Sequence, residues 1–130
     1  MAGLENYNTN IGNFSLYDPS TWGSRADGTT KGTGFFGILP ASDGKIVIEY
    51  GMGFNYDGKE IEVPLINPYQ SQAQILEVLQ GKQPTTEMLD NAWRWGADRL
   101  RSGKSPFIEN NEKPYNLSGH KGLEGVRSQQ

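Results

Sequence analysis

Residues 45–65 read KIVIEYGMGFNYDGKEIEVPL, in which two runs of alternating apolar and polar residues flank Asp57-Gly58. A period of two is typical of a strand that buries one face. Asp-Gly between two such runs favours a two-residue type I′ turn, because both central residues of that turn need a positive φ. We therefore predict an antiparallel hairpin that places apolar residues opposite one another. The predicted pairs are Phe54 with Ile61, Met52 with Val63, and Tyr50 with Leu65.

A second Asp-Gly pair, Asp43-Gly44, precedes this hairpin. A two-residue turn there would add a strand before the hairpin. The pairs it predicts are Ala41 with Ile46, Leu39 with Ile48, and Phe35 with Met52. The sequence thus predicts a three-stranded antiparallel meander over residues 33–41, 45–55 and 59–65. Pro40 has no amide hydrogen to donate, so we expect the first strand to lie at the sheet edge.

Two helical patterns follow the predicted sheet. Ser71 and Gln74 have the spacing of a capping box and predict a helix over residues 71–80. A longer apolar stripe predicts a second helix, from Thr85 or Thr86 to Gly103. The predicted fold class is α+β: a three-stranded antiparallel β-meander covered by two C-terminal helices, with extended N- and C-terminal arms.

A chain of 130 residues fits one domain. We divide it into an extended N-terminal arm at residues 1–24, a small α+β domain at 25–108, and an extended C-terminal arm at 109–130. The N-terminal arm is rich in Asn, Gly and Ser, yet it carries more aromatic side chains than a solvated linker does. We expect it to become ordered in a groove, either on its own domain or on a neighbouring chain. The predicted anchors in this arm are Tyr7, Phe14, Tyr17 and Trp22.

The composition argues against several classes of protein. Without cysteine, the chain has neither disulfides nor a cysteine-ligated zinc site. A net charge of −3 and a pI near 5.1 argue against a general nucleic-acid binder, and we expect no sequence-specific nucleic-acid partner. Apolar runs fall short of the roughly 18 residues that a bilayer span needs, and residues 1–12 lack a secretory pattern. We therefore expect neither membrane association nor export.

Few residues offer catalytic chemistry, and we predict no catalytic, cofactor-binding or metal-binding residues and no cofactor. His120 is the single histidine, and a loop histidine is usually solvated. Glu49, Glu60 and Glu62 fall on the non-core face of the predicted sheet, where they form either a solvated surface or the carboxylate pair of a glycoside hydrolase. The glycine-rich run 28–34 leads into a predicted strand, whereas a Walker loop opens a helix, so it does not favour a nucleotide site.

Two tryptophans lie two residues apart on the second predicted helix. Trp93 belongs to the predicted apolar stripe, whereas Trp95 is about 200° further around the helix and cannot face the same core. Trp95 therefore contacts either one of the arms or a partner protein, because tryptophan is favoured as an interface anchor. We include Trp95 among the predicted interface residues.

Several short motifs occur in order along residues 25–108. They are ADGT at 26–29, KG at 31–32, GFFG at 34–37, DGKE at 57–60, GK followed by PT at 81–85, and GKSPF at 103–107. In this order they resemble a small domain encoded by tailed bacteriophages and prophages, which occurs in short phage proteins and in larger virion-associated polypeptides. The resemblance supplies no catalytic residues, and neither arm has a counterpart in it.

The resemblance implies a non-enzymatic virion structural or accessory protein, a component of the capsid, connector or tail. We expect it to be made in the bacterial cytoplasm and located in the virion. Its expected partners are other phage structural proteins, bound through the apolar arms, and further copies of itself within an assembly. One alternative is a phage-encoded peptidoglycan-degrading enzyme that uses Glu49 with Glu60 or Glu62. Another is a host-directed binding protein that is absent from the particle.

Overall fold

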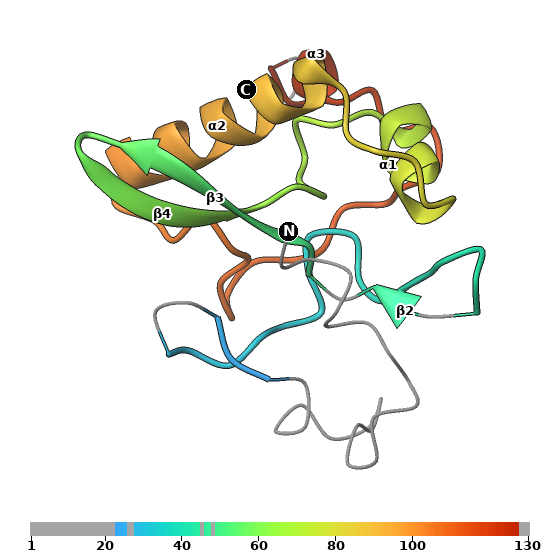
Figure 1. Ribbon diagram of the computed structural model, residues 1–130, viewed down its shortest axis with the longest axis horizontal. Helices are drawn as coiled ribbons and strands as arrows, with labels where there is room; N and C mark the ends of the chain where they lie inside the picture. Colours follow the sequence, from blue (N-terminus) through green and yellow to red (C-terminus); the bar gives the residue numbers. More distant parts are fainter. Residues whose placement is uncertain (1–22, 26–27, 45, 48, 128–130) are drawn as a thin grey trace.

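The computed structural model describes residues 23–25, 28–44, 46–47 and 49–127 (Figure 1). The predicted anchors Tyr7, Phe14, Tyr17 and Trp22 lie outside the described residues. The strands are β1 Leu39–Pro40, β2 Ile46–Val47, β3 Gly51–Tyr56 and β4 Lys59–Pro64, and the helices are α1 Gln72–Leu79, α2 Thr86–Arg101 and α3 Leu123–Arg127. These elements give an α+β fold.

The predicted hairpin forms in the predicted register. β3 and β4 are antiparallel, with Met52 opposite Val63 and Phe54 opposite Ile61. Asp57 and Gly58 have φ of 53° and 80°, the pair of positive values that a type I′ turn requires. The pairing continues past β3, where the amide of Leu65 donates to the carbonyl of Tyr50 over 2.6 Å. Turn chemistry and the apolar alternation therefore agree in this hairpin.

The predicted third strand of the meander is not confirmed. Within the described residues, β1 and β2 form a separate two-stranded ladder with Leu39 opposite Val47, one residue away from the predicted register. The amide of Gly44 donates to Ala41, and Gly44 has a positive φ of 83° whereas Asp43 does not. A three-residue loop ending in a left-handed glycine is the usual alternative to a two-residue turn, and it shifts the pairing by one residue.

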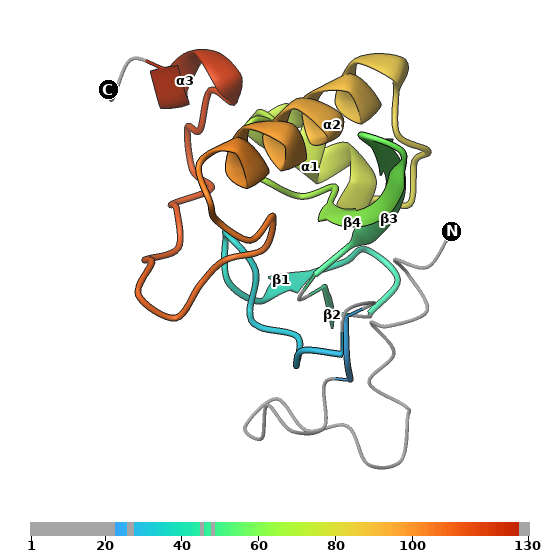
Figure 2. The same cartoon turned by 90° about the vertical axis from the view of Figure 1, so that its left-hand side faces the viewer.

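Both predicted helices are present. Ser71 accepts from the amide of Gln74 and donates its own amide to the Gln74 side chain, which completes the capping box of α1. Thr85 caps α2 by accepting from the amide of Met88. Helix α2 lies across the β3–β4 hairpin (Figure 2). A Cβ placed on Gly96 would lie 2.5 Å from a methyl carbon of Val63, so the helix approaches the hairpin as closely as only glycine allows.

The apolar core is shared by the hairpin, the helices and the loop that precedes β1. Its buried residues are Phe35, Phe36, Leu39, Val47, Tyr50, Val63, Leu65, Ile66, Ile75, Val78, Leu79, Met88, Ala92 and Trp95. Phe35 meets the Trp95 ring edge to face, with ring centroids 4.9 Å apart. Because Phe35 and Phe36 reach the core from a turn, the segment before β1 is held by side-chain packing rather than by a sheet.

The residues after 108, which we expected to form an extended arm, contact the parent domain. The amide of Tyr115 donates to the Phe35 carbonyl over 2.6 Å, and Leu123 donates to the Tyr69 carbonyl. An isolated bridge joins Ser71 to Lys121. The short helix α3, absent from our prediction, follows this bridge. The described part of the C-terminal segment therefore forms a strap over its own core.

Candidate functional site

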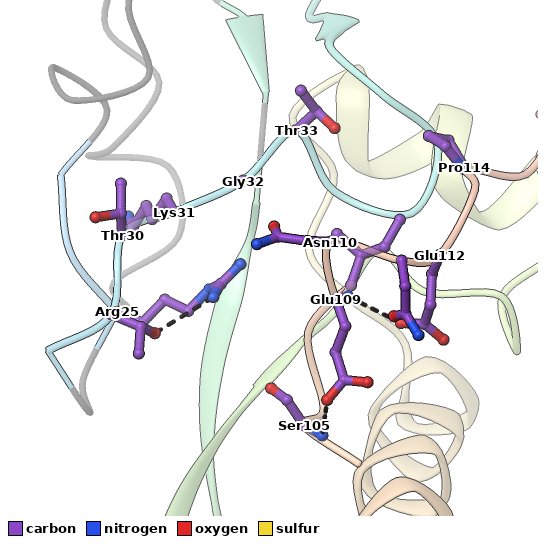
Figure 3. Close-up of a pocket in the computed structure, with 13 residues that line it drawn as sticks. Arg25, Thr30, Lys31, Gly32, Thr33, Ser105, Glu109, Asn110, Glu112 and Pro114 are labelled. Atoms are coloured by element: carbon purple, nitrogen blue, oxygen red, sulfur yellow. Dashed lines mark hydrogen bonds between the residues drawn. The ribbon is translucent and has the colours of Figure 1, made fainter.

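A cleft lies between two loops of the domain. One wall is formed by Arg25 and residues 29–33, and the other is formed by Ser105, residues 108–112 and Pro114 (Figure 3). Its volume is about 930 Å³. Pockets that bind small ligands usually measure about 300–1,000 Å³, so this cleft has room for an organic ligand or a short peptide segment.

The first wall is anchored by a buried ion pair between Arg25 and Glu49. The Nη2 of Arg25 donates to Oε2 of Glu49 over 2.6 Å, and Nε donates to Oε1 over 3.1 Å. The Glu49 side chain is only 2% exposed and also accepts from the amide of Gly32. The guanidinium of Arg25 lies 4.8 Å from the centroid of the Phe107 ring. One carboxylate thus fixes two points of the 25–33 loop against the core.

The second wall is anchored by Arg99 of α2. Its guanidinium forms a bidentate pair with Glu112 at 2.6 and 2.7 Å. It also donates to the carbonyls of Ser105 and Phe107, so three points of the 105–112 loop converge on one side chain. The amide of Glu109 donates to Glu112 over 2.8 Å. The planar guanidinium has enough donors to hold this loop without other secondary structure.

The second ion pair changes the acidity of the groups around it. The pKa of Glu112 is lowered from its ordinary value of 4.5, chiefly because Arg99 donates hydrogen bonds to the ionised carboxylate. Burial raises the pKa of the Tyr115 hydroxyl, and the nearby carboxylate of Glu112 raises it further. Burial likewise raises the pKa of Tyr50. The Glu112 carboxylate is therefore in its charged form over the whole neutral range, where it holds the loop.

The centre of the cleft is lined by neutral polar side chains. Thr30, Thr33, Asn110 and Asn111 face it from the two loops, and Figure 3 shows the Asn110 amide extending from its loop toward the opposite wall. Among the residues that the structure describes, these four side chains form no hydrogen bonds, whereas the carboxylates of Glu109 and Glu112 accept from Ser105 and Arg99. Ile108 and Pro114 add apolar surface. The cleft therefore offers hydroxyl and amide groups beside charges that are already paired.

The predicted carboxylate cluster does not form on an exposed face. Glu49, expected on the solvated side of the sheet, is buried because Arg25 and Gly32 fold over it. Glu60 and Glu62 instead line a smaller cleft of about 310 Å³ together with Arg25 and Phe107. The prediction that Glu49 lies on an exposed sheet face is therefore wrong.

The two tryptophans of α2 exchange the places we predicted for them. Trp95 is 6% exposed and donates its indole N–H to the carbonyl of Pro106, whereas Trp93 is 39% exposed. The buried face of α2 runs through Met88, Ala92, Trp95 and Arg99, because the apolar stripe is rotated relative to the one read from the sequence. Trp95 is thus a core residue of its own chain and does not present a surface to a partner.

His120 is half-buried rather than solvated. Its Nε2 lies 2.7 Å from the carbonyl oxygen of Pro68, and its ring meets Phe36 and Tyr115 edge to face. It therefore helps to hold the C-terminal strap on the core. In the described ranges, no group of three His, Asp or Glu side chains could hold a metal ion.

The two ion pairs of the cleft were not predicted from the sequence. Arg25 and Glu49 are 24 residues apart, and Arg99 and Glu112 are 13 apart. Neither spacing matches a helix or strand period, so no local pattern indicates them.

Comparisons with protein-family models, with curated proteins and with solved structures found no match. The described residues include no helix with the length and apolar character needed to cross a bilayer.

Proposed function

We propose that this chain is a non-enzymatic structural or accessory protein of a tailed-bacteriophage virion, in the capsid, connector or tail. It binds neighbouring phage structural proteins, including further copies of itself, through its N-terminal arm. The observation that carries the proposal is the ordered set of motifs along residues 25–108, which resembles a phage-encoded domain. Its place is the virion, and no sequence-specific nucleic-acid partner is required.

The chemistry of the cleft supports a binding role over catalysis. Arg25 and Arg99 are each engaged by a carboxylate, and both pairs hold loops against the core. An enzyme of the glycoside-hydrolase type needs a carboxylic acid and a second carboxylate beside the scissile bond. Glu49 cannot fill either place while its oxygens accept from Arg25 and Gly32. The charged residues of this site therefore hold the two loops in place.

The composition of the N-terminal arm supports binding to other subunits. Four aromatic anchors, Tyr7, Phe14, Tyr17 and Trp22, are spread through a segment that also contains Asn, Gly and Ser. Ordering such a segment costs conformational entropy, which contact with a neighbouring subunit offsets. We expect the compact domain to act as the rigid base from which the arm reaches its partner.

Mass spectrometry of purified particles tests this function. We expect the chain to be present in particles of the phage that encodes it, at a stoichiometric copy number. Replacing the four arm aromatics by alanine should lower its incorporation at least tenfold while leaving the purified protein folded. A matched control replaces Leu76, an exposed residue of α1, by alanine. Absence of the wild-type chain from particles would instead favour the host-directed binding protein.

A further inference from the structure

We propose that the cleft between residues 25–33 and 105–114 receives the N-terminal arm of a second copy of this chain. The docked segment is Asn6–Ile11, which reads NYNTNI. This inference rests on the proposed function, because it names the partner and the receptor of the arm. An arm on one subunit that enters a cleft on the next is a heterologous contact, the kind that builds rings and filaments.

The charges of the cleft select a neutral ligand. Of the charged residues that line the cleft, Arg25 is paired with Glu49, Glu112 is paired with Arg99, and Glu109 accepts from the amide of Ser105, so a charged ligand would compete with these existing partners. The proposed segment carries no charge, and Glu5 and Asp18 are the only charged side chains in residues 1–22. An arm of this composition can therefore enter without breaking either ion pair.

The polar groups of the cleft match those of the segment. Asn6, Asn8 and Asn10 alternate with Tyr7, Thr9 and Ile11. In an extended chain, alternate side chains point to opposite sides. The three asparagines would then face the hydroxyl and amide groups of the cleft, which belong to Thr30, Thr33, Asn110 and Asn111. The side chains on the opposite side of the segment would contact the apolar surface of Ile108 and Pro114. A volume of about 930 Å³ accommodates a segment of this kind.

The origin of the arm allows it to reach a neighbouring cleft. The carbonyl of Gly23 accepts from the amide of Lys31, and Ser24 forms a bridge with Thr30. The arm thus leaves the domain beside the first wall of the cleft. Because an extended chain spans about 3.3 Å per residue, the residues between Ile11 and Gly23 can cover roughly 40 Å.

Disulfide trapping in the full chain tests the proposal, because the chain has no cysteine of its own. We would mix two variants, Thr9→Cys and Asn111→Cys, under a mild oxidant. A disulfide needs Cα atoms within about 7 Å of each other, so it reports close approach. We expect a covalent dimer from this mixture. The matched control replaces Asn111→Cys by Ser118→Cys, which is also exposed but lies outside the cleft, and should give at least tenfold less dimer.

A second measurement tests the chemistry of the contact. Thr33→Val and Asn110→Leu remove two hydrogen-bonding groups of the cleft, and together they should lower the yield of the Thr9–Asn111 dimer about tenfold. Circular dichroism would establish that these variants fold. Equal yields from the cleft and control mixtures, or an unchanged yield in the Val and Leu variants, would overturn the proposal. So would a double variant, Thr9→Cys with Asn111→Cys in one chain, that closes only within itself.

These outcomes are separate from those of the proposed function. A chain that is incorporated into particles through its arm aromatics, yet gives no dimer, binds a different receptor, so the cleft assignment is wrong and the virion role stands. A chain that forms the specific dimer but is absent from particles retains the arm-and-cleft contact and loses the virion role.

Discussion

The two halves of this domain are held together by different interactions. Residues 51–103 contain the β3–β4 hairpin and helices α1 and α2, and within these three elements the backbone hydrogen bonds join residues close in the sequence or directly across the turn. The described residues of 23–50 and 104–127 are mostly irregular, and side chains far apart in the sequence connect them. Glu49 connects Arg25 with Gly32, and Arg99 connects Ser105, Phe107 and Glu112. Charged side chains therefore hold together loop segments that are far apart in the sequence.

The two Asp-Gly turns show the same difference on a smaller scale. At Asp57-Gly58 both residues have positive φ and the turn has two residues. At Asp43-Gly44 only Gly44 has a positive φ, and the amide of Gly44 donates to the carbonyl of Ala41. The first turn joins two strands whose apolar residues fix the register, whereas the second joins two strands of two residues each. Identical dipeptides thus adopt different turns where the flanking pairing is weak.

The largest effect is expected from breaking the pair that holds the loop half. Replacing Glu49 by glutamine leaves the Arg25 guanidinium partly buried without a counter-charge. Breaking a buried ion pair by removing one partner costs about 3–5 kcal/mol, and because Arg25 retains some exposure we expect the free energy of unfolding to fall by about 3 kcal/mol. Urea unfolding measures the loss. Hydrogen exchange should show it first in residues 28–33, while the β3–β4 hairpin stays protected.

An exposed ion pair in the helical half provides the control. Arg94 and Asp90 are 2.8 Å apart on α2, and both side chains are about half exposed. Exposed pairs contribute about 0–1 kcal/mol, so replacing Asp90 by asparagine should change the free energy of unfolding by less than about 0.5 kcal/mol. If the two substitutions cost the same, the loop half does not depend on its buried pair.

The next effect is expected at the contact between α2 and the hairpin. Alanine usually stabilises a helix by about 0.5–1 kcal/mol relative to glycine. At Gly96 the added methyl would collide with Val63, and overpacking of this kind costs about 1–3 kcal/mol. We therefore expect Gly96→Ala to lower the free energy of unfolding by about 2 kcal/mol.

A double-mutant cycle separates this collision from other effects. Val63→Ala removes the methyl groups that the new side chain meets, so the double variant should be more stable than the sum of the two single changes by about 1 kcal/mol. Additive losses would mean that the helix does not approach the hairpin as closely as the structure indicates.

The hairpin and the helices could be predicted because their signals are local. The Asp57-Gly58 turn, the alternation of Met52 and Phe54, and the capping box at Ser71 each lie within a few residues of the structure they specify. Local propensity and tertiary packing favour the same structure at these positions, so the sequence pattern is sufficient to predict the hairpin and the helices.

The cleft could not be predicted because its contacts join residues far apart in the chain. No sequence pattern near Glu49 indicates that Arg25 will cover its side chain. The alternation of apolar and polar residues instead predicted that Glu49 lies on a solvated face of the sheet. The sequence prediction chose the wrong tryptophan of α2 because Trp93 and Trp95 are equally apolar, and Trp95 is buried by Phe35 and Tyr69, which are distant in the sequence. In the C-terminal strap, the isolated Tyr115 and Leu117 gave no period, yet both pack against the core.

The smallest effect concerns the second loop pair and depends on pH. Because Arg99 lowers the pKa of Glu112 in the folded chain, the pair contributes stability above the ordinary carboxyl pKa of 4.5. That contribution disappears as the pH falls through the lowered folded pKa and Glu112 becomes protonated. A hydrogen bond to a charged group contributes about 1.5–3 kcal/mol, and since Glu112 keeps partial exposure we expect Glu112→Gln to cost about 1.5 kcal/mol at pH 7.

The difference between wild type and Glu112→Gln should therefore shrink toward zero as the pH is lowered from 7 to below 4.5, when unfolding is followed by urea titration at each pH. Glutamine keeps an oxygen that can accept from the Glu109 amide, so the substitution mainly removes charge. Glu77→Gln on the exposed side of α1 removes one negative charge without touching Arg99 and serves as the control. A difference that stays constant across this range would mean that Glu112 holds the 105–112 loop by shape and hydrogen bonding alone. In that case Glu49 would be the carboxylate whose charge distinguishes the stability of the loop half from that of the hairpin half.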